Sequence, residues 1–135
     1  MASKQTVIKD AELKFLRSHE LGRLATASSD ATPHVIPVVY ALDEDAGPVI
    51  ATDYRTKKLA DLKENPKVSF VVDEYNPNRA VVIQGTCQIL ERGQEYLRLL
   101  GILFDRFEFY RKHPWGEGES PILKISIKKT ISWGL

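Results

Sequence analysis

Short apolar segments joined by turns of hairpin length run through most of this chain, and this pattern limits the folds that it can adopt. Residues 80–90 alternate apolar and polar side chains, which predicts a long strand with one buried face. Gly85 interrupts this strand and indicates a bend, a bulge or a close backbone approach. Helices are expected at 10–17, 56–64 and 94–112. The expected strands are 22–27, 34–42, 48–52, 68–72, 80–90 and 123–128.

Because a single expected helix separates the first strands, we expect an antiparallel barrel rather than repeated βαβ units. The elements predict a mainly β protein, a six-stranded antiparallel barrel with about three peripheral helices, forming one domain over residues 1–135. A small barrel has no room for a large ligand inside. A ligand site is therefore expected on its outer surface or between two copies.

Residues 34–42 form a nearly continuous apolar run, which predicts a strand buried on both faces. Pro37 lies within this run and lacks a ladder donor, so it indicates a sheet edge or a local break. Backbone groups left unpaired near a break could bind the polar edge of a planar ligand. The alternative is a plain edge-strand proline.

Composition and charge exclude several classes of protein. The net charge is +1 and no basic stripe is present, so a nucleic-acid binder is not expected. The longest apolar runs are shorter than a membrane span, and the start, MASKQTVIKD, lacks the apolar core of a signal peptide. A single cysteine, Cys87, excludes an internal disulfide and a cysteine-rich zinc site. We expect a cytoplasmic protein without membrane contact.

Three cations surround the start of the helix expected at 56–64. Arg55, Lys57 and Lys58 lie at the positive end of the helix dipole, where acidic residues are usual, and Thr56 takes the capping position. Free N–H groups, a hydroxyl and cations at one point suit a bound phosphate. The alternative is a set of solvated surface cations.

No residue pattern typical of a catalytic triad, a nucleotide-binding glycine loop or a paired metal site is found. His19, His34 and His113 are isolated, which favours surface or structural roles. Cys87 lies on the apolar face of its strand, where a free cysteine acts as a small hydrophobe. Neither a catalytic side chain nor a metal site is therefore predicted.

Four segments carry a resemblance to a known family: 21–26 with 33–40, 50–70, 82–87 and 125–135. Together they resemble the pyridoxamine 5'-phosphate oxidase-like family of FMN-binding split barrels. The second is the most specific: a strand, a threonine, basic residues, a helix, Asn65-Pro66 and a further strand follow one another as in that family. The ending, Ser132-Trp133-Gly134-Leu135, is similar to the branch of probable FMN-dependent or deazaflavin (F420)-dependent oxidoreductases.

The resemblance implies a cofactor site at the interface of a homodimer. It assigns the flavin phosphate to Thr52, Arg55, Thr56, Lys57 and Lys58. It assigns the isoalloxazine ring to Val35, Ile36, Pro37, Val38 and Val39. Contacts from the second subunit are expected from Gln84, Trp133, Tyr96, Phe107 and Tyr110.

The implied function is an oxidoreductase that transfers a hydride through bound FMN to a small-molecule substrate, with no side chain required as acid or base. F420 is the alternative cofactor, and its acidic tail would then meet Arg79, Arg92 or Arg111. A different alternative is a non-enzymatic module that binds flavin or haem, with His34 or His113 as the haem ligand. A third is a scaffold that has lost its cofactor.

Two further expectations rest on the resemblance. The vitamin B6 enzyme of this superfamily has a segment with Arg and His after its last Trp, whereas this chain ends two residues after Trp133, so authentic pyridoxamine-phosphate oxidase activity is not expected. Replacing Lys57 and Lys58 together by alanine is expected to weaken cofactor binding by about one to a few kcal/mol and to leave the fold intact.

Overall fold

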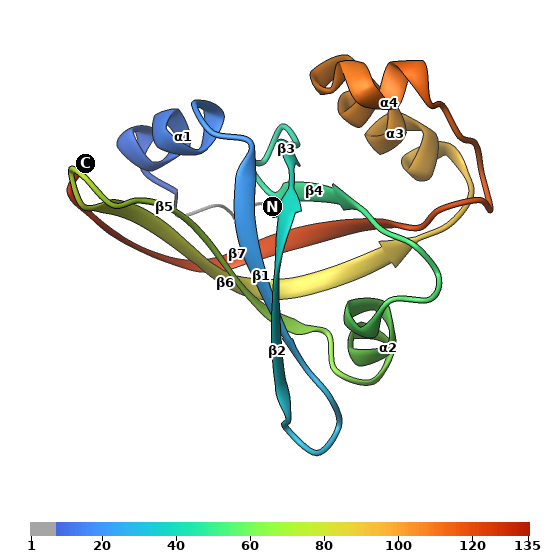
Figure 1. Cartoon of the computed structure of the whole chain (residues 1–135), viewed down its shortest axis with the longest axis horizontal. Helices are drawn as coiled ribbons and strands as arrows, with labels where there is room; N and C mark the ends of the chain where they lie inside the picture. Colours follow the sequence, from blue (N-terminus) through green and yellow to red (C-terminus); the bar gives the residue numbers. More distant parts are fainter. Residues whose placement is uncertain (1–7) are drawn as a thin grey trace, which may run out of the picture.

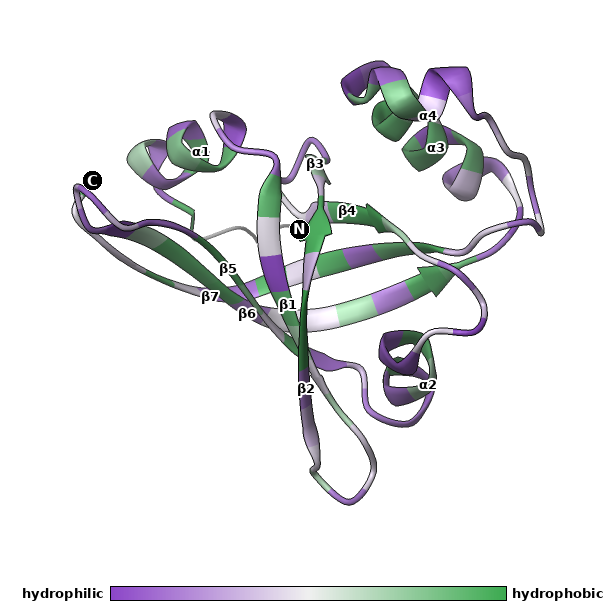
Figure 2. Cartoon of the chain, in the orientation of Figure 1, coloured by the Kyte–Doolittle hydropathy of each residue, from purple (hydrophilic) through white to green (hydrophobic). Residues whose placement is uncertain are grey.

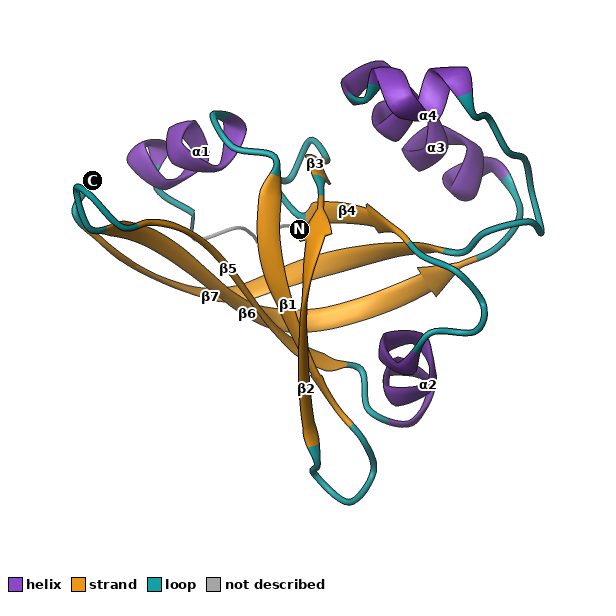
Figure 3. Cartoon of the chain, viewed as in Figure 1, coloured by secondary structure: helices purple, strands orange, loops and turns teal. Residues whose placement is uncertain are grey.

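A strongly curled antiparallel sheet organises the molecule (Figure 1). The computed structural model describes residues 8–135. The strand order is β2-β1-β5-β6-β7-β4-β3, with the helices at the margins of the sheet (Figure 3). In chain order the elements are α1 (Asp10–Arg17), β1 (Leu21–Ala27), β2 (Pro33–Val39), β3 (Ala41–Leu42), β4 (Pro48–Ala51), α2 (Lys57–Glu64), β5 (Lys67–Glu74), β6 (Arg79–Leu90), α3 (Gln94–Arg106), α4 (Glu108–Lys112) and β7 (Ile122–Trp133).

β2 and β3 follow each other in the chain yet lie at opposite edges of the sheet, so the sheet curls until its two edges approach. Tyr40 lies at this crossing and is almost wholly buried. Its hydroxyl donates to the Leu16 carbonyl at 2.6 Å, and its ring packs edge-on against Phe70. The predicted mainly β, antiparallel split barrel with peripheral helices is confirmed.

Two details of the strand prediction are wrong. The sheet of residues 8–135 has seven strands rather than six, because 34–42 divides at Tyr40 into β2 and β3. β2 is also not buried on both faces, since Val35, Pro37 and Val39 are exposed. A continuous apolar run does not reveal whether both faces of the strand are covered by other parts of the fold. The prediction from Pro37 is confirmed, because β2 forms one edge of the sheet.

The helix prediction is also corrected. Residues 8–135 contain four helices rather than three, because the helix expected at 94–112 is divided at Phe107. Phe107 has an extended backbone (φ −119°, ψ 115°), which ends α3 and precedes α4. The turn lets Tyr110 pack edge-on against Phe107 and Trp115, with ring centroids 5.3 and 4.9 Å apart. No helix within these residues is long and apolar enough to cross a membrane.

The hydrophobic core has two parts. Figure 2 shows hydrophobic residues along the strands of the sheet and along α3. The first fills the barrel and includes Leu24, Ile50, Leu59, Phe70, Ile83 and Leu123. The second lies beneath α3 and includes Val49, Tyr96, Leu99, Leu103 and Ile122. Because Leu59 belongs to the first part, α2 is fixed against one end of the barrel. The C-terminus lies at the other end, beside α1 (Figure 1).

The ribbon of β6 and β7 is the longest pairing in the sheet, and its register shifts between Gln84 and Gly85. A Cβ atom at Gly85 would lie 1.9 Å from the Ser126 carbonyl oxygen, much closer than a non-bonded contact allows. The bulge and close approach predicted at Gly85 are therefore both present.

Candidate anion and cofactor site

The start of α2 is built by two threonines of the loop that leaves β4. Thr56 has an extended backbone, and its Oγ1 accepts a hydrogen bond from the Leu59 N–H at 3.4 Å while donating to the Asp53 carbonyl at 2.9 Å. The Thr52 hydroxyl lies 3.1 Å from that of Thr56. Because the Thr56 proton is directed to Asp53, Thr52 donates in this second contact. The predicted helix start is confirmed, with Thr56 as the cap.

Polar groups at this helix start are left without partners. The backbone N–H groups of Lys57 and Lys58, at the first two helical positions, make no hydrogen bond within residues 8–135. The first turn contains no acidic residue. These N–H groups and the dipole therefore favour an anion from outside the chain.

Of the three cations Arg55, Lys57 and Lys58, Lys58 would gain most from a bound anion. Its exposed fraction is only 8%. Burial lowers the pKa of Lys58, and the nearby Asp53 carboxylate opposes this shift. The Lys58 side chain nevertheless makes no hydrogen bond or ion pair with any residue from 8 to 135. A buried cation without a hydrogen-bonded partner is unfavourable, so a bound anion would stabilise it.

Lys57, by contrast, already has a partner in the chain. Its Nζ lies 2.7 Å from the buried carboxylate of Asp61, one turn further along α2. Asp61 also accepts a hydrogen bond from Thr26 of β1 at 2.8 Å. These contacts, that of Lys57 first, lower the pKa of Asp61. Lys57 therefore helps to fasten α2 to the barrel, and the exposed Arg55 is the more available cation at the surface.

The residues predicted to hold the flavin ring divide between the two faces of β2. Val35, Pro37 and Val39 are exposed, with Val35 at 62%, whereas Ile36 and Val38 point toward the barrel core. Side chains of Val35, Pro37 and Val39 can therefore contact a ligand on the outer face, and Ile36 and Val38 can contact it only through their backbone.

The pairing register extends this outer face across the sheet. One row passes from Pro37 through Arg23, Val71 and Val82 to Ile131. The neighbouring row passes from Val35 through Ala25, Ser69 and Gln84 to Lys129. Gln84 thus shares the outer face with the exposed side of β2. Thr26, a buried residue that points to the inner face of β1, pairs with His34 of β2 and donates to Asp61 of α2, so this helix is fixed beside the end of the β1–β2 hairpin.

The structure does not bring Trp133 to this site within one chain. Trp133 is exposed at the end of β7, where its Nε1 donates to Asn78 at 3.0 Å. This end of the sheet lies beside α1, away from α2 (Figure 1). A contact between Trp133 and a ligand at α2 would have to come from a second subunit.

The aromatic residues expected from the long helix are placed differently from the prediction. Tyr96 is fully buried, and its hydroxyl donates to the Ser120 carbonyl at 2.6 Å, so it has no surface to offer a second subunit. Phe107 and Tyr110 are half-buried and pack against each other. The sequence pattern showed the apolar stripe of this helix, but not that the stripe is covered by its own chain.

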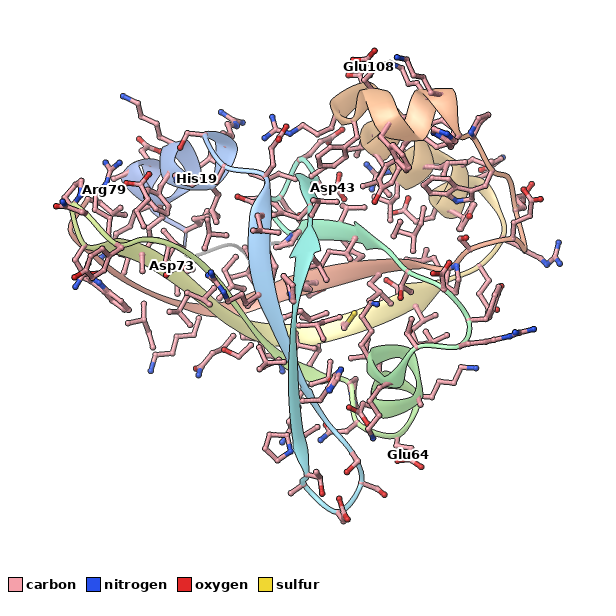
Figure 4. The ribbon with its side chains drawn as sticks, viewed as in Figure 1. His19, Asp43, Glu64, Asp73, Arg79 and Glu108 are labelled. Carbon is pink, nitrogen blue, oxygen red and sulfur yellow. The ribbon has the colours of Figure 1, made fainter. Side chains whose placement is uncertain are left out.

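The cations suggested for an F420 tail are mostly engaged. Arg79 pairs with Glu74 at 2.7 Å, and Figure 4 shows it at the end of the sheet near α1, far from Glu64 of α2. Arg111 donates to the carbonyls that end α3 at 2.7 and 3.0 Å. Arg92 makes no hydrogen bond or ion pair within residues 8–135.

The remaining candidates fit their expected structural roles. His19 contacts Glu74 at 2.6 Å, and His113 contacts the Phe109 carbonyl at 3.1 Å. No group of His, Cys, Asp or Glu within residues 8–135 could hold a metal ion. Burial raises the pKa of Cys87 to about 12, so its thiol is not a nucleophile at neutral pH.

The curled antiparallel sheet with helices at its margins is the fold of the split-barrel class. The comparison with protein families agrees with this class: the family described as pyridoxamine 5'-phosphate oxidase matches residues 8–133. The chain belongs to this family. The family predicted from sequence is therefore confirmed.

Individual relatives differ in what they bind. A 5a,11a-dehydrotetracycline/5a,11a-dehydrooxytetracycline reductase of Streptomyces rimosus subsp. rimosus is 39% identical over 90 residues, which are 61% of this chain and 63% of that reductase. The match thus spans less than two thirds of the reductase. An FAD-binding protein of Mesorhizobium loti has 27% identity and a TM-score of 0.70, with 93% of this chain and 91% of that one covered.

A haem storage protein of Vibrio cholerae shares the fold, with a TM-score of 0.77 over 90% of this chain and 92% of that one. Its sequence identity is 14%. This similarity concerns the fold alone.

Proposed function

We propose that the chain is an oxidoreductase that uses a flavin-type cofactor, with the cofactor phosphate at the start of α2 and the ring along β2. The observation that carries the proposal is Lys58, a buried cation without a hydrogen-bonded partner beside two free N–H groups of a helix start. The 39% identical reductase supports an activity in the same class.

The residues present fit the phosphate end of such a cofactor. The Lys58 ammonium and the N–H groups of Lys57 and Lys58 would bind the phosphate, and Arg55 would meet it from the solvent side. Thr52 and Thr56 hold this loop rather than donate to the ligand, because their hydroxyl protons already have acceptors. Lys57 neutralises Asp61 and so removes a carboxylate charge that would repel the phosphate.

A bound flavin or deazaflavin supplies the hydride transfer itself. The chain then contributes orientation and exclusion of water. The exposed face of Val35, Pro37 and Val39 offers an apolar surface for the ring. No catalytic acid or base is required of the chain. The physiological substrate is a small molecule that reaches the ring between two subunits.

The proposal includes a homodimer. The outer face of the sheet exposes large apolar side chains that a solitary barrel leaves in water: Leu21, Val35, Val39, Ile131 and Trp133. They lie on the same outer face as Gln84, and Val35 shares the row of paired residues that contains it. Pairing two such faces would bury them and would let Gln84 and Trp133 of one subunit approach the cofactor of the other. A cytoplasmic location stays a prediction.

FMN is the simplest cofactor for this site, and F420 is the alternative. Both carry a phosphate after the same kind of side chain, so the start of α2 suits either. Of the cations suggested for the F420 tail, only Arg92 is left without a hydrogen bond or ion pair within residues 8–135. A haem-binding module is supported by the shared fold alone, with His34 of β2 as its candidate ligand.

The test is a fluorescence titration of the cofactor-free protein with FMN and with F420, for the wild type and Lys58→Met. Methionine fills the buried space without a charge. We expect binding of at least one cofactor to weaken by about 1.5–3 kcal/mol, the usual range for a hydrogen bond to a charged group. Lys63→Met, an exposed lysine in the last turn of the same helix, is the matched control. Equal affinities for Lys58→Met and the wild type would contradict the phosphate site.

A further inference from the structure

A cavity of about 310 Å³ lies between the end of β4 and α4. The end of β4 is joined to the segment before β7, because the Thr52 N–H donates to the Pro121 carbonyl at 3.0 Å. Among residues 8–135, four of those that line the cavity carry aromatic rings, one is acidic, and none is a lysine or an arginine. These five residues are Asp53, Phe109, Tyr110, His113 and Trp115. The lining therefore suits a cation better than an anion.

Three of the rings are inclined to one another rather than parallel. Tyr110 meets Trp115 at 86° with centroids 4.9 Å apart, and Phe109 meets Tyr110 at 62° with centroids 6.3 Å apart. Rings at such angles form walls around a compact group, whereas a flat ligand would stack between parallel faces. The face of an aromatic ring is electrically negative, so several inclined rings attract a compact cation.

Contacts within the chain hold these rings in place. Trp115 donates from Nε1 to the hydroxyl of the fully buried Tyr96 at 3.0 Å and packs edge-on against Phe104 with centroids 5.0 Å apart. The Phe109 ring stacks on that of His113 at 4.4 Å, and Nδ1 of His113 lies 3.1 Å from the Phe109 carbonyl. Because the rings are already ordered, a ligand would bind without paying much of the entropy of arranging them.

Asp53, the acidic residue of the lining, has a carboxylate that is free to meet a ligand. This carboxylate makes no hydrogen bond or ion pair within residues 8–135, since the contact with Thr56 uses the backbone carbonyl of Asp53. Burial, and then the Asp53 charge, raises the pKa of Tyr110, so the carboxylate acts on the aromatic wall of the cavity. A carboxylate and several aromatic faces together complement an organic cation.

We propose that this cavity binds a tertiary or quaternary ammonium group carried by a small organic molecule. The aromatic faces attract the positive charge that is spread over the N-alkyl groups, and Asp53 supplies the opposite charge. A metal ion is not complemented, since no group of His, Cys, Asp or Glu within residues 8–135 could hold one. The volume is at the lower end for ligand pockets, which fits one such group with a short chain attached. Arg55, Lys57 and Lys58 do not line the cavity, so the inference is independent of the proposed phosphate site.

Calorimetric titration of the cofactor-free protein with choline tests the inference by binding alone. The comparison ligand is the neutral analogue of choline in which a carbon atom replaces the nitrogen, because it has the same shape without the charge. We expect choline to bind about tenfold or more tightly than this analogue. The titration is made at about pH 8, where histidine is ordinarily neutral, so that His113 adds no positive charge to the lining.

Two variants separate the aromatic and the acidic contributions. Phe109→Leu keeps an apolar side chain without an aromatic face, and Asp53→Asn keeps the size of the side chain without its charge. Both residues are exposed, so we expect the fold to stay intact and choline binding to weaken about threefold or more in each variant. Tyr75→Leu and Asp105→Asn are the matched controls, exposed residues outside the lining that should leave choline binding unchanged.

Three results would overturn the ammonium site: no binding of choline, equal binding of choline and its neutral analogue, or unchanged choline affinity in either cavity variant. Each would leave the proposed phosphate site standing, because the cofactor takes no part in these titrations.

Discussion

Lys57 and Lys58 are adjacent in the chain but have opposite surroundings, and this difference separates a cation that is paired within the chain from the one that we propose binds a ligand. Lys57 is half-exposed and paired with Asp61, whereas Lys58 is buried and has no hydrogen-bonded partner within residues 8–135. A helix places neighbouring residues about 100° apart, so one faces the Asp61 carboxylate and the other does not. The cost of burying Lys58 is consistent with a site that is completed by an anion.

The two single variants should therefore affect stability in opposite ways. Lys57→Met leaves the buried Asp61 charge with Thr26 as its remaining partner, so we expect a lower urea midpoint than in the wild type. Lys58→Met removes an unpaired buried cation, so we expect an equal or higher midpoint without cofactor. Urea denaturation followed by circular dichroism measures both. An unchanged midpoint for Lys57→Met would contradict the structural role of this pair.

These surroundings also revise the expectation that replacing both lysines leaves the fold intact. The double change combines a loss of cofactor binding with the loss of the Asp61 partner, so its effect on binding is not a clean measure of the phosphate site. Single replacement of Lys58 separates the two effects.

At the scale of elements, the sequence predicted what depends on neighbours along the chain. The threonine cap of α2 and the bulge at Gly85 are local, and both were found where residue type indicated them. The division of 34–42 and the burial of Tyr96 depend on distant strands and on α3, which no local pattern contains. The burial of Lys58 is of the same kind, and it is the signal of the site that sequence reasoning could not see.

The ribbon of β6 and β7 provides a prediction with an internal control. In Gly85→Ala the new methyl group would meet the Ser126 carbonyl, so we expect a loss of about 2–4 kcal/mol in the free energy of unfolding. In Gly101→Ala, within α3, nothing lies within 4 Å of the added methyl group. We expect that variant to gain about 0.5–1 kcal/mol from helix propensity. Urea denaturation of both would detect the opposite signs, and a stable Gly85→Ala would contradict the close approach.

Asp43 joins three elements and predicts how stability depends on pH. Its buried carboxylate accepts hydrogen bonds from Arg98 of α3 at 2.7 and 2.8 Å and from Lys124 of β7 at 2.9 Å. These bonds, those of Arg98 first, hold the pKa of Asp43 well below its usual range. Because the folded pKa lies below the unfolded one, this stabilisation is fully present above about pH 4 and is lost as the pH falls.

Asp43→Asn is therefore expected to lower the free energy of unfolding at neutral pH by about 2–3 kcal/mol, since the buried Lys124 loses one of its two carboxylates. Its stability should also fall less steeply than that of the wild type as the pH drops below about 4. Glu108→Gln, which breaks an exposed pair with Lys112, is the control and should change stability by less than about 0.5 kcal/mol. If the free energy of unfolding fell equally steeply with falling pH for Asp43→Asn and the wild type, the stabilising role of the Asp43 carboxylate would be contradicted.

At the scale of the whole molecule, the curled sheet separates the start of α2 from the end of β7. The start of α2 lies at one end of the sheet, while β7, which finishes at Trp133, ends at the other (Figure 1). In the proposed function, a single subunit thus carries two parts of the cofactor site that it cannot bring together. An antiparallel arrangement of two outer faces would place the β7 end of one subunit beside α2 of the other.

This arrangement predicts that oligomeric state and cofactor affinity change together. Ile131→Glu places a charge in the outer-face row that runs to Pro37, so we expect the dimer to dissociate to monomers in sedimentation experiments and flavin affinity to fall about tenfold or more. Leu97→Glu is the control, because Leu97 is an equally apolar, exposed residue on α3 rather than on the outer sheet face. It should leave both properties unchanged. A dimeric Ile131→Glu, or a monomeric variant that binds flavin as tightly as the wild type, would show that the site is completed within one chain. The position of Trp133 would then have no part in binding, and the exposed apolar rows of the sheet would need another partner to cover them.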